Sequence, residues 1–312
     1  MFYVATLISH PERPAVTDAL AHSVARYLPH GRPIDWLAPG VATDIAFLVD
    51  EHAEERRSGD ARRRLLEDFG ADIRDMIGGE PVDVVIQPHD RRRKKLLVAD
   101  MDSTMIGQEC IDELADYAGF KSRVATITER AMRGEIAFEP ALRERVALLK
   151  GLPATVIAEV IADRIRVTPG GRTLVRTMRA NGAYTCVVSG GFTAFTSHVA
   201  AMIGFDEQRA NTLLTDADGK LTGMVAEPIV GRDAKVDTLL ALRERLRLAP
   251  EDTLAVGDGA NDIPMIEAAG LGVAFHGKPA IRQAAPTACI DHSDLTALLY
   301  AQGYRREEFV VL

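Results

Sequence analysis

The sequence has few cysteines, no long hydrophobic run and no signal-like start. Three cysteines, Cys110, Cys186 and Cys289, lie far apart among 312 residues, with no CxxC pair and no histidine cluster at zinc spacing. These absences argue against a disulfide framework and a structural zinc site. No stretch of about 18 apolar residues occurs, and residues 1–14 lack the basic and apolar segments of a signal peptide. We therefore expect a cytoplasmic protein with no membrane partner.

The sequence also lacks an excess of positive charge. It carries 37 Lys+Arg against 45 Asp+Glu, a net charge of −8, and most of the acidity belongs to residues 1–90. Because counterion release from a nucleic acid requires a basic surface, we expect no nucleic-acid partner. Residues 91–95, RRRKK, are a short basic run. We interpret this run as a solvated connector that leads into a strand, with a nucleic-acid or anionic-ligand patch as the alternative.

The composition is that of an ordinary globular protein, with 47% hydrophobic and 26% charged residues. The length suggests two domains, and the hydrophobic patterns differ between the two parts of the chain. Residues 1–90 predict a small α+β domain. Its expected strands are 3–8, 45–50 and 82–88, and its expected helices are 15–28 and 60–77.

Strands alternate with helices from residue 96 onward, so residues 91–312 predict a second domain. Expected strands are 96–100, 184–190, 253–259 and 271–275, and expected helices include 106–118, 121–150, 170–182 and 233–248. This order is typical of an α/β fold with a doubly wound, mostly parallel sheet. Residues 213–225 predict a hairpin that turns at Asp218-Gly219.

Three of the predicted strands end in reactive polar residues. The first ends at Asp100 and Asp102, the second at Ser189 and Gly190, and the third leads into Asp258. Ligands of open parallel sheets bind outside the carboxyl ends of the strands. We therefore expect these side chains to converge at one edge of the sheet.

The paired carboxylates at the first strand end are suited to phosphoryl transfer. Asp100 can attack phosphorus and form an aspartyl-phosphate, while Asp102 can pass a proton to the leaving oxygen and take one from water. Asp258 offers a hard oxygen ligand for Mg²⁺, and Lys235 and the Ser189 hydroxyl can hold phosphoryl oxygens. Taken alone, Asp102 could equally cap the following helix.

Four motifs, in this order, resemble those of the haloacid dehalogenase superfamily. They are ADMDST at 99–104, VVSGGF at 187–192, Lys235, and GDGANDIPM at 257–265. A lone DxD is weak evidence, but four motifs at strand ends or following helices are specific. The resemblance implies a Rossmannoid core with a helical cap at about residues 106–165.

The resemblance also implies roles for individual residues. Mg²⁺ is expected to be bound by the Asp100 side chain, the Asp102 backbone carbonyl and Asp258. Asn261 is expected to orient the phosphate, and Asp262 to support the site and to pair with Lys235.

Within the superfamily, the chain is similar to the phosphoserine phosphatase family. Glu109 follows the predicted nucleophile by nine residues, and residues 133–151, RGEIAFEPALRERVALLKG, resemble the helical cap segment of that family. By position, Glu109 matches the residue that meets the substrate ammonium, and Phe138 and Arg145 match residues that enclose the substrate. A zwitterionic amino acid needs a carboxylate for its amine and a guanidinium for its carboxylate.

The implied function is Mg²⁺-dependent hydrolysis of O-phospho-L-serine to L-serine and phosphate, the last step of serine biosynthesis. One alternative is a related phosphomonoesterase or phosphotransferase acting on another small phosphate ester. Another is a signalling receiver domain, which also uses a strand-end aspartate, Mg²⁺ and a lysine, but has no cap. The pattern of residues 1–90 is similar to ACT-like modules, so either serine binding or simple packing, including a possible homodimer, is open.

Overall fold

The described residues of the amino-terminal part form a four-stranded antiparallel sheet with two helices on one face. The computed structural model describes residues 1–49, 59–132 and 135–311, so residue 50 of the predicted strand 45–50 lies outside them. The elements of the amino-terminal part are β1 (Phe2–Ser9), α1 (Asp18–Tyr27), β2 (Asp35–Ala38), β3 (Ala42–Leu48), α3 (Gly59–Ile77) and β4 (Val82–Pro88). Both helices pack on one shared core with the strands. The sequence did not predict β2, because four residues are too few for a periodic pattern.

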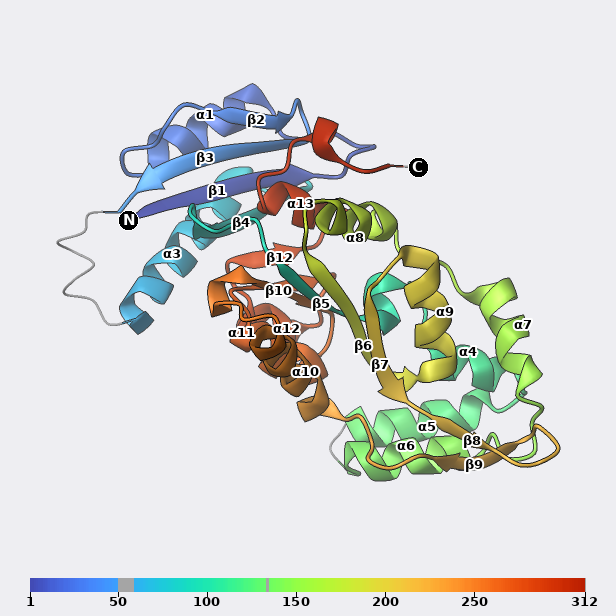
Figure 1. The fold of residues 1–312 in the computed structure, drawn as a ribbon. Coiled ribbons are helices and arrows are strands. Elements are labelled where there is room, and N and C mark those ends of the chain that lie inside the picture. The colour runs from blue at the N-terminus through green and yellow to red at the C-terminus, as the bar shows by residue number, and fades with distance from the viewer. Residues whose placement is uncertain (50–58, 133–134, 312) are drawn as a thin grey trace.

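The rest of the chain contains six further strands of the main sheet and helices on both of its faces (Figure 1). The strands are β5 (Leu96–Asp100), β6 (Tyr184–Phe192), β7 (Glu207–Asn211), β10 (Thr253–Gly257), β11 (Leu271–Phe275) and β12 (Ala288–Ile290). One core joins the sheet to α8 (Gly171–Ala180), α9 (Thr193–Ile203) and α13 (Ala297–Ala301). Another joins it to α10 (Arg232–Arg245), α11 (Ile263–Ala268) and α12 (Pro279–Ala284). These six strands are parallel, which confirms the predicted α/β fold class.

All ten of these strands belong to one continuous sheet. Their order is β2-β3-β1-β4-β12-β11-β10-β5-β6-β7, and the join is an antiparallel pairing of β4 with β12. Beside it, the buried carboxylate of Asp83 accepts hydrogen bonds from the backbone N–H groups of Asp291, His292 and Ser293, at 2.8–3.1 Å. The two parts of the chain therefore share backbone hydrogen bonds, and the division at residue 90 stays a prediction.

Four helices lie together beyond the carboxyl ends of β5 and β6 (Figure 1). They are α4 (Cys110–Tyr117), α5 (Lys121–Met132), α6 (Phe138–Ala147) and α7 (Thr155–Arg164). The hairpin of β8 (Leu213–Thr215) and β9 (Leu221–Val225) joins them, with Gly151 N donating to Leu221 O and Leu221 N donating to Leu152 O, both at 2.8 Å. We call these four helices and the hairpin the cap. The hairpin and its turn at Asp218-Gly219 are confirmed.

Two helix predictions in this region were wrong. The helix predicted to begin at residue 106 begins at Cys110, because Ile106 has an extended backbone and forms an isolated β-bridge with Val167. The single helix predicted over 121–150 is two helices, α5 and α6. Residues 133 and 134 of the quoted cap segment lie outside the described residues.

The basic run at 91–95 makes contacts within the chain. Arg92 forms an ion pair with Asp44 of β3. Arg93 pairs with Glu308 at 2.7 Å and stacks on Tyr304, the buried Lys94 donates to the carbonyl of Glu251 at 2.9 Å, and Lys95 lies 3.3 Å from Asp252. Arg92 thus joins the run to the amino-terminal part, Arg93 contacts the carboxyl-terminal end, and the two lysines contact the segment just before β10. In the described residues, no helix has the length and apolar character needed to cross a membrane.

Candidate active site

The carboxyl ends of three neighbouring strands bring the predicted residues together. β10, β5 and β6 are adjacent in the sheet. Asp100 and Asp258 stand at or just after the carboxyl ends of β5 and β10, and Ser189 follows Val188, the last residue of β6 that pairs with β5. All three are at least nine-tenths buried. The convergence expected from the strand order is therefore present in the structure.

A buried lysine binds two of the aspartates. Lys235, in the first turns of α10, lies 2.7 Å from an Asp100 oxygen and 2.5 Å from an Asp262 oxygen. Burial alone would lower the pKa of Lys235, but the two carboxylates raise it above its ordinary value. Burial and the nearby Asp262 raise the pKa of Asp100 well above its ordinary value, and Lys235 opposes that rise. The lysine is thus held charged beside the predicted nucleophile.

The second carboxylate of the DxD motif is held by hydrogen bonds on both oxygens. Asp102 accepts from the backbone N–H of Cys110 at 3.1 Å and from the Ser189 hydroxyl at 3.2 Å. The Ser189 oxygen in turn accepts from Gly191 N at 2.8 Å. Burial raises the pKa of Asp102, and these hydrogen bonds partly oppose the rise. A carboxyl with a raised pKa at this position is suited to donating and accepting a proton.

Three buried carboxylates can serve as ligands of a metal ion. Oxygens of Asp100, Asp258 and Asp262 all lie within 4.8 Å of one another. Lys278 contacts Asp258 at 2.9 Å, and Lys235 contacts Asp100 and Asp262. The carboxylates outnumber the lysines, and oxygen ligands of this kind suit a hard divalent cation. The donor set therefore fits such an ion.

The cap contributes a guanidinium, and the residue just before it contributes a carboxylate. Glu109 precedes α4 and accepts a hydrogen bond from the Ser103 hydroxyl at 2.8 Å. Burial and the nearby Asp102 raise the pKa of Glu109 to about 7. Arg145, on α6, donates to the Thr128 hydroxyl at 3.4 Å, and burial lowers its pKa while acidic neighbours, Glu109 among them, oppose this.

An aromatic ring of the cap rests on two glycines of the core. A Cβ on Gly190 would lie 3.1 Å from Phe138 Cζ, and a Cβ on Gly231 would lie 3.7 Å from Phe138 Cδ1. Phe138 is still 39% exposed. Gly190 therefore leaves the space that the ring uses, so the predicted cap residue and the predicted strand-end glycine are in contact range.

One predicted residue, Asn261, remains to be placed, and two residues near the site were not predicted. Asn261 lies exposed on a short turn, Ala260–Asp262. Sequence reasoning missed Lys278, although its position three residues after β11 is the kind of strand-end signal used for the others. It also missed Asn211, which is 2% exposed at the end of β7.

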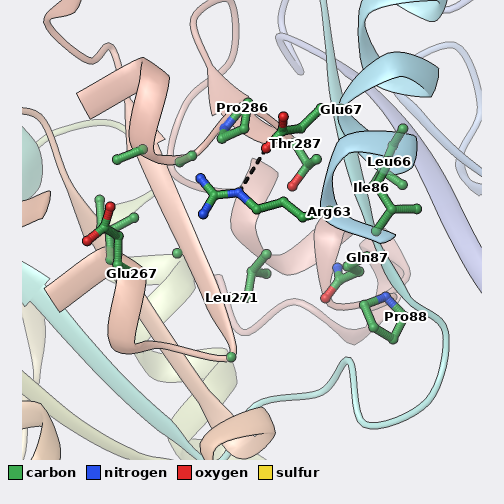
Figure 2. A pocket seen from close by; sticks show the side chains of 15 residues that line it. Arg63, Leu66, Glu67, Ile86, Gln87, Pro88, Glu267, Leu271, Pro286 and Thr287 are labelled. Carbon is green, nitrogen blue, oxygen red and sulfur yellow. Dashed lines mark hydrogen bonds and ion pairs between the residues drawn. The ribbon is translucent and has the colours of Figure 1, made fainter. Parts of the chain in front are cut away.

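A crevice in the described residues lies elsewhere. Its volume is about 480 Å³, and it runs between α3 and the amino end of β11, where Arg63 and Glu67 form an ion pair at 2.8 Å (Figure 2). Since the predicted residues lie at the carboxyl ends of the strands, this crevice is at the opposite edge and has no part in their chemistry.

Comparison with known proteins decides the family. A model of haloacid dehalogenase-like hydrolases matches residues 97–267, more than half of the chain. The chain is 41% identical over 307 residues to the phosphoserine phosphatase of Streptomyces coelicolor, covering 97% of this chain and 71% of that protein. The chain belongs to the phosphoserine phosphatase family of haloacid dehalogenase-like hydrolases. The resemblance drawn from the four motifs is thereby confirmed, as is the prediction that the chain is an enzyme.

Other relatives agree with this assignment. The phosphoserine phosphatase of Archaeoglobus fulgidus is 42% identical over 243 residues, which cover 77% of this chain and 67% of that protein. A HAD-family hydrolase of Salmonella enterica superposes with a TM-score of 0.81 at 28% identity, covering 96% of this chain and 98% of that one. A substrate-bound phosphoserine phosphatase gives 0.61 at 40% identity over 66% of this chain and 97% of that one. Phosphatases of this superfamily generally use a divalent metal ion.

Proposed function

We propose that this enzyme hydrolyses O-phospho-L-serine to L-serine and phosphate in the cytoplasm, with Mg²⁺, as the last step of serine biosynthesis. The observation that carries the proposal is that Glu109 lies near both Asp102 of the buried cluster and Arg145 of the cap, while Lys235 contacts Asp100. Glu109 and Arg145 suit the two charges of an amino acid. Asp100, Asp102 and Lys235 suit a phosphate ester. The names of the relatives point to the same substrate.

The chemistry follows from the two strand-end carboxylates. An Asp100 oxygen attacks phosphorus, the P–O bond to the serine oxygen breaks, and Asp102 gives its proton to that oxygen. Water then attacks the phosphorus of the aspartyl-phosphate while Asp102 accepts a proton from that water. The P–O bond to Asp100 breaks and phosphate is released. Bound Mg²⁺ would be held by Asp100, Asp258 and the Asp102 carbonyl, with Asp262 in support, and would offset the charge of the phosphate.

The substrate is held at both ends. The phosphoryl oxygens meet the ammonium of Lys235, the hydroxyl of Ser189 and the backbone at Gly190, and Asn261 lies at the rim of this region. At the other end, Glu109 binds the ammonium and Arg145 the carboxylate. Phe138 closes over them and keeps bulk water from the intermediate.

The test is phosphate release from phosphoserine, phosphothreonine, a nucleoside monophosphate and an aryl phosphate, with and without a chelator. We expect a strong preference for phosphoserine that chelation removes and added Mg²⁺ restores. Asp100→Asn should lower turnover by at least about a thousandfold while the folded circular dichroism spectrum is kept, because an amide oxygen cannot form the intermediate. Asp68→Asn on the exposed face of α3 is the matched control and should be as active as the parent chain.

Three other outcomes are informative. Turnover of the aryl phosphate alone would keep the Asp100 chemistry and discard the amino-acid pocket. Formation of a phosphorylated alcohol when homoserine is added would show a phosphotransferase instead of a hydrolase. Full activity of Asp100→Asn would refute the assignment of the nucleophile.

A further inference from the structure

The side chain of Asn211 lies at a break in the β6–β7 ladder. The two strands pair in register at Cys186↔Glu207, Val187↔Gln208 and Val188↔Arg209, and pairing resumes at Phe192↔Asn211. Three residues of β6, 189–191, therefore face a single residue of β7. Such a bulge turns the strand out of the ladder and leaves backbone groups without ladder partners. Here it turns Ser189 toward Asp102.

The amide of Asn211 pairs with one backbone group of the bulge and with two of the segment before α10. Its Nδ2 donates to Gly190 O at 2.9 Å and to Val230 O at 3.1 Å, and its Oδ1 accepts from Val230 N at 2.7 Å. Both amide hydrogens and the oxygen are thus used while the side chain is 2% exposed. One buried side chain ties together two segments that are 40 residues apart in the sequence, the bulge of β6 (called here the Ser189–Gly190 loop) and the loop before α10.

Both loops belong to the proposed site. The first carries Ser189 and Gly190, and the second runs from Val230 through Gly231 into α10, which holds Lys235. Phe138 of the cap rests on Gly190 and Gly231, one glycine from each loop. Asn211 therefore links the two segments on which Phe138 rests.

We propose that Asn211 is a positioning residue, which sets the distance between the Ser189–Gly190 loop and the start of α10 and so forms the seat for Phe138. This inference rests on the proposed function, since it assigns a role within that site. Asparagine is the residue that the geometry requires, because two carbonyl oxygens and one N–H face the amide. An aspartate of the same shape would set a carboxylate oxygen against those two carbonyls, and leucine would leave all three groups unpaired.

The experiment measures Asn211→Asp beside a control variant, Asn181→Asp. It also combines Asn211→Asp with Phe138→Ala in a double variant. Asn181 donates its amide to Thr177 O at 2.8 Å at the end of α8, away from the site. We expect Asn211→Asp to lower kcat/KM for phosphoserine by at least about tenfold, and Asn181→Asp to change it less than twofold. We also expect the double variant with Phe138→Ala to lose less than the product of the two single losses, since both act on one contact.

A residue with a merely structural role would give different results. In that case Asn211→Asp would lower Tm without changing kcat/KM of the folded enzyme, or the loss of kcat/KM in the double variant would equal the product of the two single losses. Either result overturns the proposal. If Asn211→Asp does not fold, Asn211→Ser, which keeps one donor, is measured in the same way. Should the parent chain hydrolyse an aryl phosphate but not phosphoserine, the proposed function fails, and the role of Asn211 is then decided on the aryl phosphate.

Discussion

Glu109 is the ionisable residue whose charge should govern substrate affinity near neutral pH. Its pKa is raised to about 7 by burial and by the nearby Asp102. A raised pKa means that the carboxyl becomes protonated as the pH falls through 7, while the ammonium of the substrate stays charged. We expect KM for phosphoserine to rise about tenfold between pH 8 and pH 6, in proportion to the loss of ionised Glu109.

Steady-state kinetics across this pH range will check the expectation. The aryl phosphate has no ammonium, so its KM should not follow the titration of Glu109. Glu109→Gln should have a high KM for phosphoserine at every pH and a flat profile. If the glutamine variant kept the slope of the parent chain, the titrating group would be another one, such as the phosphate of the substrate.

Single residues were predictable where a strand end marked them. Asp100, Ser189 and Asp258 follow buried apolar runs, and parallel strands must end at the same edge. Asn211 was not predictable, because its role depends on which backbone groups of two distant loops face its amide. Lys278 carried the same strand-end signal as the others, but its partner, Asp258, is known only once β10 and β11 are placed side by side.

The contact between Phe138 of α6 and Gly190 of β6 depends on the absence of a Cβ atom at Gly190. A Cβ at Gly190 would be 3.1 Å from Phe138, closer than most such contacts, whereas a Cβ at Gly231 would be at an ordinary 3.7 Å. We expect Gly190→Ala to push the ring away and to lower kcat/KM for phosphoserine by about tenfold. Gly231→Ala, under the same ring, should stay within about twofold of the parent chain.

The measurement is kcat and KM for both alanine variants, with Tm recorded to show that each is folded. Equal losses in the two variants would indicate that backbone changes, and not the contact with Phe138, limit the rate. Wild-type kinetics in Gly190→Ala would mean that the ring does not close on this glycine during turnover.

The elements were predicted best where the hydrophobic period was long and a turn signal followed. Helix α8 and the hairpin at 213–225 are examples, with Gly182 and Gly219 marking the turns. Prediction failed at the start of α4, because Ile106 has an extended backbone and pairs with Val167, a contact that the local sequence does not indicate. It also failed to divide α5 from α6, since the connecting residues carry charges that fit a helix equally well.

The joining of the two parts into one sheet could not be predicted from the sequence. β4 and β12 pair across about 200 residues, and the buried Asp83 accepts hydrogen bonds from a loop at the other end of the chain. Apolar strands such as β4 look the same whether they lie at an edge or in the middle of a sheet. The division at residue 90 and the possible homodimer stay predictions.

If the shared sheet stabilises the enzyme, then a chain of residues 91–312 should be less stable than the whole. It would leave the edge of β12 unpaired, together with the backbone N–H groups of Asp291, His292 and Ser293, which now bind Asp83. Each lost hydrogen bond costs on the order of 1 kcal/mol, so Tm should fall by about 5–10 °C. An open strand edge also favours association between chains.

Calorimetry and light scattering of the two chains test this, with kcat on the aryl phosphate as the control. The catalytic residues all lie between Asp100 and Lys278, so activity per folded molecule should be kept at temperatures below the transition. A shortened chain with an unchanged Tm and no association would mean that the β4–β12 join adds nothing to stability. A folded but inactive shortened chain would instead place the amino-terminal sheet among the parts that shape the active site.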